Sequence, residues 1–294
     1  MEEALESIKT QVELFSKVIV VFEGNDIEYA ISKKRFSGFT PNLEIHRLIE
    51  EKGLSHARNL AIEKCESEWI VFIDDDARLN SGYGESLRDA IEQFPRSAGF
   101  TGPILPEYSR GSRIFPTEME WLVSCNTEQR KISPVRNGFG ANMVFNRNLI
   151  VDANLSFSSD LGWTGGMEKS NLSGEETDFS VRLSSHHDLP IYWIPGLSVN
   201  HLVPKSRTNL GYVWNRSMKE GRTKATLDLG TGSKKMRKEY GHLIKSIFIS
   251  IPKEILCLPL KPVRSSWNIL GISTMIAGTG FSFLKWKLII LFSR

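Results

Sequence analysis

The first hundred residues alternate between short apolar runs and segments of helical period, and this alternation restricts the fold more than any other feature of the chain. The runs KVIVVFEG (17–24) and WIVFI (69–73) are apolar and largely β-branched, which is typical of buried strands. Between them, SHARNLAIEKC (55–65) begins with a serine at an N-cap position and carries apolar residues at helical spacing. The pattern predicts an α/β protein, a three-layer sandwich around a mostly parallel central sheet.

The same reasoning extends the prediction along the rest of this region. Further strands are expected at 43–48, 98–104, 142–145 and 191–194, and helices at 2–15, 84–94 and 175–185. Hydrophobic residues make up 40% of the 294 residues and charged residues 24%, as in globular proteins. A disulfide framework or a cysteine-based zinc site is not expected, because the three cysteines are widely spaced and form no C-x-x-C pair: Cys65, Cys125 and Cys257.

Charge divides the chain into two unlike parts. Residues 1–200 carry 20 Lys and Arg against 30 Asp and Glu, a net charge of −10, whereas residues 201–294 carry 17 against 4, a net charge of +13. GTGS (230–233) is the clearest linker, so we predict domains at 1–229 and 230–294. The N-terminus has neither a basic n-region nor an apolar h-region, and it is not expected to be a signal peptide.

The basic C-terminal part contains the most apolar stretch of the chain. Residues 265–284 carry no formal charge and would span about 30 Å as a helix, close to the thickness of a hydrocarbon core. Glycines and Asn268 weaken its insertion, and residues 243–260 mix apolar side chains with lysines and prolines. We expect these segments to lie in an anionic membrane surface. A single membrane span and an ordinary helical subdomain remain alternatives. Nucleic-acid binding is not expected, because the lysines are interleaved with long apolar runs.

Three adjacent carboxylates, Asp74, Asp75 and Asp76, follow the predicted strand 69–73 directly. In an open α/β sheet, ligands bind at the carboxyl ends of strands. Adjacent carboxylates repel one another unless a cation compensates, and Mg²⁺ or Mn²⁺ is commonly held by one or two carboxylates together with substrate phosphates. The triplet therefore indicates a nucleotide diphosphate bridged through a metal. The alternative is an acidic surface turn that caps the next helix.

A second acidic cluster, Glu175, Glu176 and Asp178, opens the predicted helix 175–185. Acidic residues in a first turn are favoured by the helix dipole alone, but one of them could also serve as a general base. His201 follows the strand 191–194, and it is either structural or a further metal ligand.

Four segments occur in an order that resembles family 2 glycosyltransferases of the GT-A fold. They are LSHARNLAIEKCESEWIVFIDDD (54–76), NGFGANMVFNR (137–147), FSSDLGWTGGMEKSNLSGEETDFSVRL (157–183) and IYWIPGLSVNHLVP (191–204). The resemblance implies a Rossmann-like GT-A domain and transfer of a sugar from a nucleotide-diphosphate donor to a hydroxyl acceptor, with inversion at the anomeric carbon. The acceptor would be a lipid-linked glycan or a growing polysaccharide.

The resemblance also implies roles for individual residues. Asp76, Asp74 and His201 would form the site of a divalent metal, Mn²⁺ or Mg²⁺. Glu176 occupies the position of the catalytic base, and Asp178 is the second choice. Contacts with the nucleotide sugar would come from Glu23, Arg58, Asp74 and Asp75. The pocket for the donor sugar and acceptor would be shaped by Trp163, Gly165, Gly166 and Glu175.

One departure concerns the start of the chain. The family begins with a strand and a turn that contact the nucleotide base, whereas this chain begins at the helix that should follow. We therefore expect the edges of neighbouring strands to be exposed. Two alternatives to an enzyme of this family stay open at this point, a non-catalytic sugar-binding module and a nucleotidyltransferase on a similar fold. The enzyme itself would be cytoplasmic and peripheral on the inner face of the membrane.

Overall fold

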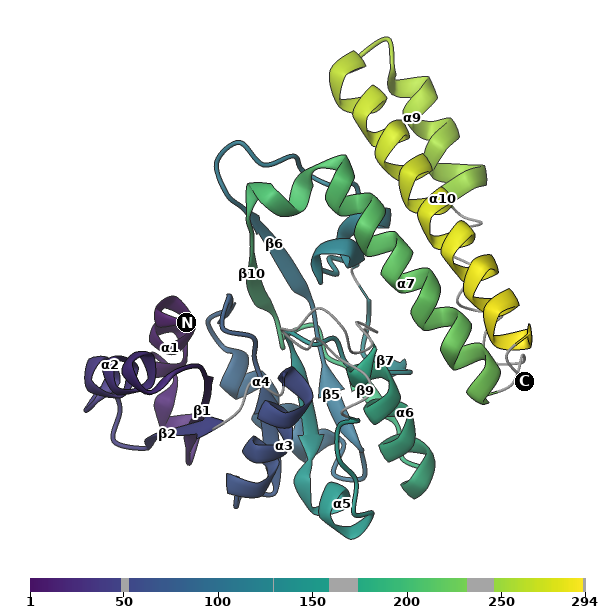
Figure 1. Ribbon diagram of the computed structural model, residues 1–294. Coiled ribbons are helices and arrows are strands. Elements are labelled where there is room, and N and C mark those ends of the chain that lie inside the picture. The colour runs from purple at the N-terminus through teal and green to yellow at the C-terminus, as the bar shows by residue number, and fades with distance from the viewer. Residues whose placement is uncertain (49–52, 129, 159–173, 232–245, 293–294) are drawn as a thin grey trace. The chain divides into compact units, whose positions relative to one another are not determined.

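The computed structural model describes residues 1–48, 53–128, 130–158, 174–231 and 246–292, with only the backbone at 226–231 and 286–292. The chain forms two compact units, whose helices and strands are labelled in Figure 1. Unit 1 comprises Met1–Leu105 and Glu128–His201, and unit 2 comprises Pro106–Thr127 and Leu202–Arg294. Unit 1 contains the predicted strands and acidic clusters.

A five-stranded sheet is the centre of unit 1. In spatial order its strands are β3 (Trp69–Phe72), β8 (Met143–Asn146), β5 (Gly99–Thr101), β9 (Ile191–Trp193) and β7 (Ser133–Val135). Only β5 and β9 pair in parallel, while β3–β8, β5–β8 and β7–β9 are antiparallel. The predicted α/β architecture is correct, but the prediction of a mostly parallel sheet is wrong. Parallel neighbours require crossover connections, and the alternation of strand and helix on which that prediction rested does not extend to β7 and β8.

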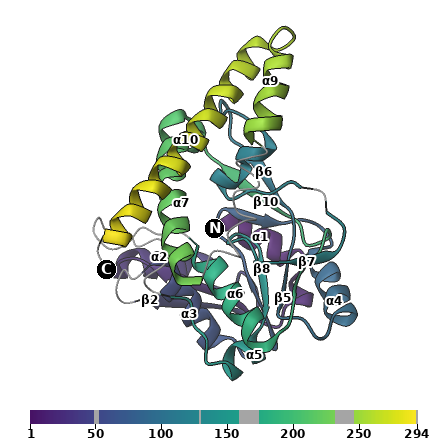
Figure 2. The same cartoon turned by 90° about the vertical axis from the view of Figure 1, so that its right-hand side faces the viewer.

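Aliphatic side chains and four phenylalanines form the core cluster of this unit. The cluster joins the sheet to three helices, α3 (Leu54–Lys64), α5 (Arg147–Asp152) and α6 (Glu175–His187) (Figure 2). Phe157 and Phe179 stack with ring centroids 4.0 Å apart, and Phe145 meets Phe179 edge-on. The core therefore packs α6, which carries the second acidic cluster, against the sheet whose strand β3 precedes the acidic triplet.

A separate two-stranded parallel sheet precedes these elements in the chain. It consists of β1 (Val18–Glu23) and β2 (Leu43–Leu48), connected by α2 (Asp26–Phe36), and α1 (Glu2–Lys9) contributes Leu5 to the small core that it shares with Val18 and Phe36. Among the described residues, β1 pairs only with β2 and β3 only with β8. Within the described residues, β1 and β3 therefore each have one edge without a partner strand.

The predicted strand 98–104 is divided in the structure. It forms β5 and a second strand, β6 (Ile104–Tyr108), separated by Gly102 and Pro103. A Cβ atom on Gly102 would lie 2.1 Å from the carbonyl oxygen of Leu197, and proline offers no N–H to a ladder. After the break, β6 joins a three-stranded sheet in the order β4-β10-β6, in which β4 is Ala77–Leu79 and β10 is Val199–Val203. Helix α4 (Tyr83–Gln93) follows β4.

Unit 2 is built largely from two long helices that pack along each other, α7 (Leu210–Thr231) and α10 (Pro262–Phe292) (Figures 1 and 2). Small residues permit the close approach: a Cβ atom on Gly221 would lie 2.3 Å from the carbonyl oxygen of Thr279. A short π-helical segment (Ser246–Ser250) and α9 (Ile251–Cys257) precede α10. Helix α7 continues through residues 229 and 230, where the sequence predicted a linker. The division into domains at 1–229 and 230–294 stays a prediction.

One helix of the described residues, Pro262–Lys285 within α10, is long and apolar enough to cross a membrane by length and composition. Its most apolar window has a mean hydropathy of 1.2 and is 39% buried inside the protein. Helix α10 packs along α7 and also contacts α9, so part of its surface is covered by other helices of unit 2.

Candidate active site

The acidic triplet and His201 come together at the end of β3. Asp74, Asp75 and Asp76 connect β3 to β4, and β10 pairs with β4 so that His201 lies opposite Ala77. The His201 ring is almost completely buried, and its Nε2 lies 3.1 Å from Oδ1 of Asp76. One potential ligand atom from each of Asp74, Asp76 and His201 lies within 4.8 Å of the others. The structure therefore assembles the three side chains that the sequence suggested as metal ligands.

The chemistry of this group fits a divalent cation. Two carboxylates and one imidazole supply the oxygen-rich, negatively charged ligands that suit Mg²⁺ or Mn²⁺. Burial raises the pKa of Asp74, opposed by the positive charge of Arg58 and reinforced by Asp76. A bound cation would remove the cost of holding these carboxylates ionised. Asp75, the middle residue, is exposed.

Arg58 links the two acidic clusters. It projects from α3, is buried, and donates from Nη1 to Oε1 of Glu175 over 3.1 Å, while its Nη2 lies 3.7 Å from Oδ1 of Asp74. Its guanidinium also lies over the ring of Phe157, 5.3 Å from the centroid. Arg58 thus places a positive charge beside both clusters, and its predicted contact with the donor stays a prediction.

The first turn of α6 holds the candidate base. Gly174, with φ of 110°, is the N-cap, and its N–H donates to Oε2 of Glu175. Glu175 is buried and its carboxylate also accepts from Arg58. Burial, together with the negative charge of Glu175, raises the pKa of Glu176 to about 8, although Arg58 acts in the opposite direction. A carboxyl group whose pKa is raised in this direction suits a general base.

Asp178, two residues further along the first turn of the same helix, has a different environment. Its Oδ2 accepts from Nε of Arg182 over 2.8 Å, and Arg182 in turn donates to the backbone carbonyl of Ser156. This pairing occupies the Asp178 carboxylate, which favours Glu176 as the base.

Glu23 lies at the end of β1, and its Oε1 accepts from the backbone N–H of Gly53, the N-cap of α3. A carboxylate at this position complements the positive end of the helix dipole. Glu23 therefore supports the helix that carries Arg58, and its predicted contact with the nucleotide remains a prediction. Trp163, Gly165 and Gly166 lie outside the described residues, so their predicted place in the sugar pocket stays a prediction as well.

Two asparagines that the sequence reasoning did not single out support the site. Asn59 forms two hydrogen bonds with the backbone of Phe157, 2.9 Å to its carbonyl oxygen and 2.7 Å from its N–H. The side chain of Asn142 accepts from the buried hydroxyl of Tyr83 and donates to the carbonyl of Leu197. The sequence contained a signal for Asn59, because this residue directly follows Arg58 in the ARN segment.

Comparison with known proteins identifies the family. The family model of glycosyl transferase family 2 matches residues 1–150, just over half of the chain. The chain belongs to this family, as the resemblance predicted, and the matched residues include the segments 54–76 and 137–147.

Relatives include a glucosyl-dolichyl phosphate glucuronosyltransferase of Haloferax volcanii, 25% identical over 77% of this chain and 72% of the relative. The succinoglycan biosynthesis protein ExoM of Rhizobium meliloti is 22% identical over 72% of this chain and 65% of its own length. A solved mannosyltransferase of Pyrobaculum calidifontis, in complex with GDP-Man and Mn²⁺, has a TM-score of 0.57 at 13% identity, covering 95% of this chain and 83% of the other. A structure of GalNAc-T7 with UDP, GalNAc and Mn²⁺ has a TM-score of 0.51 at 12% identity, covering 81% and 52%. These structural likenesses establish the GT-A glycosyltransferase fold.

Proposed function

We propose that this chain is a metal-dependent, inverting glycosyltransferase that moves a sugar from a nucleotide-diphosphate donor to a hydroxyl group of a lipid-linked or polysaccharide acceptor. The observation that carries the proposal is the juxtaposition of two clusters across Arg58: the group Asp74, Asp76 and His201 on one side, and Glu175 with Glu176 on the other. One cluster suits an anionic leaving group and the other suits proton transfer.

The donor would be held at the acidic triplet. Asp74, Asp76 and His201 would hold Mn²⁺ or Mg²⁺, and Asp74 and Asp75 would face the nucleotide. When bound, the divalent cation would supply positive charge to the diphosphate as it leaves. Arg58 adds the positive charge of its guanidinium near the same place. Both solved neighbours named above contain a nucleotide and Mn²⁺, which supports this choice of donor and metal.

The acceptor would be activated by Glu176. In its ionised form this carboxylate takes the proton of the acceptor hydroxyl while the hydroxyl oxygen attacks the anomeric carbon, and the nucleoside diphosphate departs from the opposite face. A general base of this kind contributes about 10²–10⁴-fold to the rate. Glu175 is paired with Arg58 instead.

The proposal has a direct test. Purified protein is incubated with a panel of nucleotide sugars and Mn²⁺, with membrane lipid extract or polysaccharide fragments as acceptors, and the products are identified by mass spectrometry. A product with inverted anomeric configuration is expected for one donor. Donor binding without transfer to any acceptor would contradict the proposal and favour the sugar-binding module.

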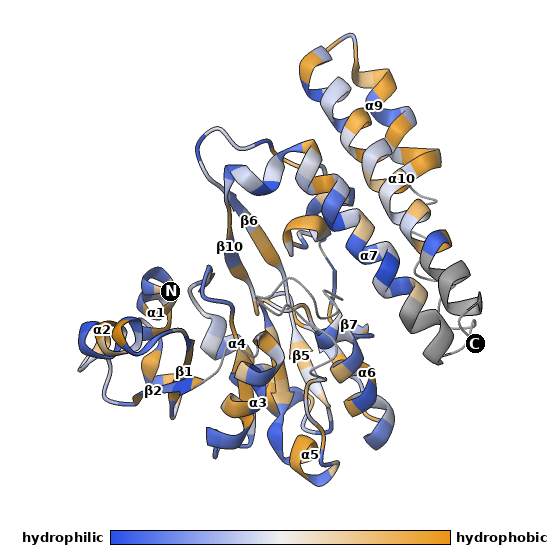
Figure 3. Cartoon of the chain, in the orientation of Figure 1, coloured by the Kyte–Doolittle hydropathy of each residue, from blue (hydrophilic) through white to orange (hydrophobic). Residues whose placement is uncertain are grey.

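We further propose that the enzyme is peripheral on the cytoplasmic face of a membrane and binds it through the segment that contains α9. Large apolar side chains in this segment are exposed, including Phe248 at 74%, Leu256 at 80% and Leu260 at 81%. Exposed basic residues, Lys253, Lys261 and Arg264, lie among them. In Figure 3 hydrophobic and hydrophilic residues alternate over α9 and the start of α10. Apolar insertion with basic contacts to lipid phosphates is typical of interfacial helices.

Vesicle flotation tests this placement. The wild-type protein is expected to float with vesicles that contain anionic lipid, and less with zwitterionic ones. Leu256→Asp with Leu260→Asp should abolish flotation. Ile27→Asp, which changes an equally exposed apolar residue of unit 1, serves as the matched control. Flotation that survives the double substitution would contradict the proposed surface.

A further inference from the structure

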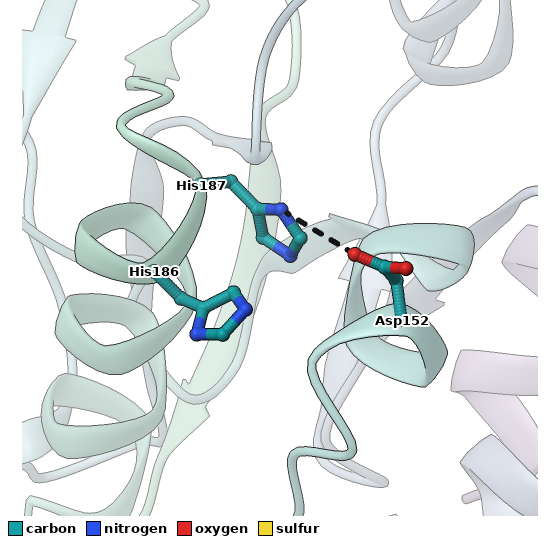
Figure 4. A group of neighbouring side chains, drawn as sticks. All are labelled: Asp152, His186 and His187. Carbon is teal, nitrogen blue, oxygen red and sulfur yellow. Dashed lines mark ion pairs between the residues drawn. The ribbon is translucent and has the colours of Figure 1, made fainter.

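A second group of metal-ligating side chains lies outside the candidate active site. Asp152 is the last residue of α5, and His186 and His187 are the last two residues of α6, so the carboxyl ends of two helices converge here (Figure 4). One potential ligand atom from each of the three residues lies within 4.8 Å of the others. Ligands of a tetrahedral ion with bonds of about 2.1 Å lie about 3.4 Å apart, so a modest rearrangement of side chains would close the group around one cation.

Hydrogen bonding prepares His187 for a cation. Its Nε2 lies 2.9 Å from the backbone carbonyl oxygen of Leu149, which can only accept, so the Nε2 atom carries a hydrogen. In the neutral ring this leaves a lone pair on Nδ1. The Nδ1 atom lies 4.0 Å from Oδ2 of Asp152, as the dashed line in Figure 4 shows. A backbone carbonyl behind a ligating imidazole is the usual way in which proteins orient a metal-binding histidine.

The surroundings also favour positive charge. The carboxyl ends of α5 and α6 each present partial negative charge from carbonyl groups that have no partner within the helix. Asp188, the C-cap of α6, adds a carboxyl group next to His187. His186 lies beside His187 with ring centroids 4.8 Å apart. Asp152 and His186 are exposed whereas His187 is largely buried, so the group offers one fixed ligand and two adaptable ones that a dissolved ion can reach.

We propose that Asp152, His186 and His187 form a second metal site, selective for Zn²⁺ or a similar imidazole-binding divalent ion, which clamps the carboxyl end of α6 to that of α5. Two imidazoles and one carboxylate suit Zn²⁺, whereas the group at the acidic triplet suits Mn²⁺ or Mg²⁺. The clamp would fix the end of α6 opposite to Glu175 and Glu176. An effect of this clamp on the candidate base rests on the proposed function, whereas the metal site itself does not.

Zinc binding can be measured without reference to catalysis. The full chain carrying Asp76→Ala, which lacks a ligand of the first group, is stripped with chelator and titrated with ZnCl₂ by calorimetry in excess Mg²⁺. One Zn²⁺ per chain is expected, with a rise in melting temperature. Adding His186→Ala or Asp152→Asn, both at exposed side chains, should weaken binding at least about tenfold, as losses around metal sites do. His187→Ala should do the same.

His46→Ala provides the matched control, because His46 also pairs with a carboxylate, Glu44, over 3.0 Å but belongs to none of the metal-ligating groups found among the described residues. This variant should bind Zn²⁺ like its parent. X-ray absorption of the zinc complex should show two imidazole ligands. Absence of stoichiometric Zn²⁺ binding, or equal affinity in the His46→Ala and His186→Ala variants, would overturn the proposed site. These experiments measure zinc binding and not sugar transfer. A failure of the zinc site can therefore be distinguished from a failure of the proposed function.

Discussion

Arg58 and Glu175, which are 117 positions apart in the chain, form a buried ion pair in which Nη1 donates to Oε1 over 3.1 Å. Both side chains are less than a tenth exposed. The pair joins α3 to the first turn of α6 and brings the positive charge of Arg58 near Asp74 as well. It is thus a structural connection between the candidate metal ligands and the candidate base.

Replacing Arg58 with alanine should destabilise unit 1 severely. Removal of one partner of a buried ion pair leaves an uncompensated charge and costs about 3–5 kcal/mol. Urea unfolding followed by circular dichroism measures the loss. Arg182→Ala breaks the more exposed pair with Asp178 and should cost about 1 kcal/mol or less. Similar losses in unfolding free energy in the two variants would show that the buried Arg58–Glu175 pair contributes no more to stability than the exposed pair.

Glu176→Gln should abolish sugar transfer and leave donor binding nearly intact, because the amide cannot accept the acceptor's proton. A loss of about 10²–10⁴-fold in turnover is expected. Asp178→Asn should cost much less, since the Asp178 carboxylate is engaged by Arg182. Turnover is followed by product mass spectrometry and donor affinity by calorimetry. Ordinary turnover in Glu176→Gln would exclude this residue as the base.

The rate of transfer should rise with pH. Burial and the neighbouring Glu175 raise the pKa of Glu176 to about 8, and only the ionised form acts as a base. Below that pKa the rate should increase about tenfold per pH unit and then level off above it. Glu175→Gln removes the neighbouring negative charge and should move the midpoint to lower pH. A profile that is flat between pH 6 and 9 under single-turnover conditions would argue against this carboxyl group.

The raised pKa of Glu176 makes the free energy of unfolding fall with pH, whereas the transfer rate rises. The folded protein keeps a proton on Glu176 at pH values where the unfolded chain has lost it. The resulting stabilisation is complete below the unfolded pKa of about 4.5 and is lost as pH rises through about 8. Glu176→Gln should therefore reduce the dependence of the unfolding free energy on pH across this window, which parallel urea titrations at pH 5 and pH 8 would reveal.

Asp76→Ala should remove metal-dependent donor binding, because it deletes the carboxylate that lies 3.1 Å from His201. Calorimetric titration of nucleotide sugar with and without Mn²⁺ measures the difference, and chelation of the wild-type protein should have the same effect. Asp89→Ala, at an exposed acidic residue of α4, is the control. Unchanged metal affinity in Asp76→Ala would contradict the assignment.

Packing between α7 and α10 can be tested with two glycines. Gly221→Ala places a methyl group 2.3 Å from the carbonyl oxygen of Thr279 and should cost about 1–3 kcal/mol in the unfolding of unit 2. Gly280→Ala adds the same group to α10 where no described atom lies within 4 Å, and it should be neutral or stabilising. Equal effects would mean that the two helices do not pack as closely as the structure shows.

Elements with a clear local pattern were predictable from the sequence. Strand β2 matches the predicted residues 43–48, and helix α6 begins at the predicted residue and extends two residues further. Hydrophobic spacing and caps are properties of neighbouring residues, so they can be recognised without the fold. The break between β5 and β6 was not predicted, because Gly102 is required there by its contact with Leu197, far away in the sequence.

The order of four motifs was sufficient to identify the family and to select the candidate acids, because those residue types recur at characteristic positions along the chain. Strand direction was not predictable, since it depends on how later segments enter the sheet. Likewise, only the folded chain shows that Arg58 meets Glu175, that His201 meets Asp76, and that His187 lies beside Asp152. Residues far apart in the sequence can be either close or distant in space, and these contacts arise when packing of the core brings the elements together.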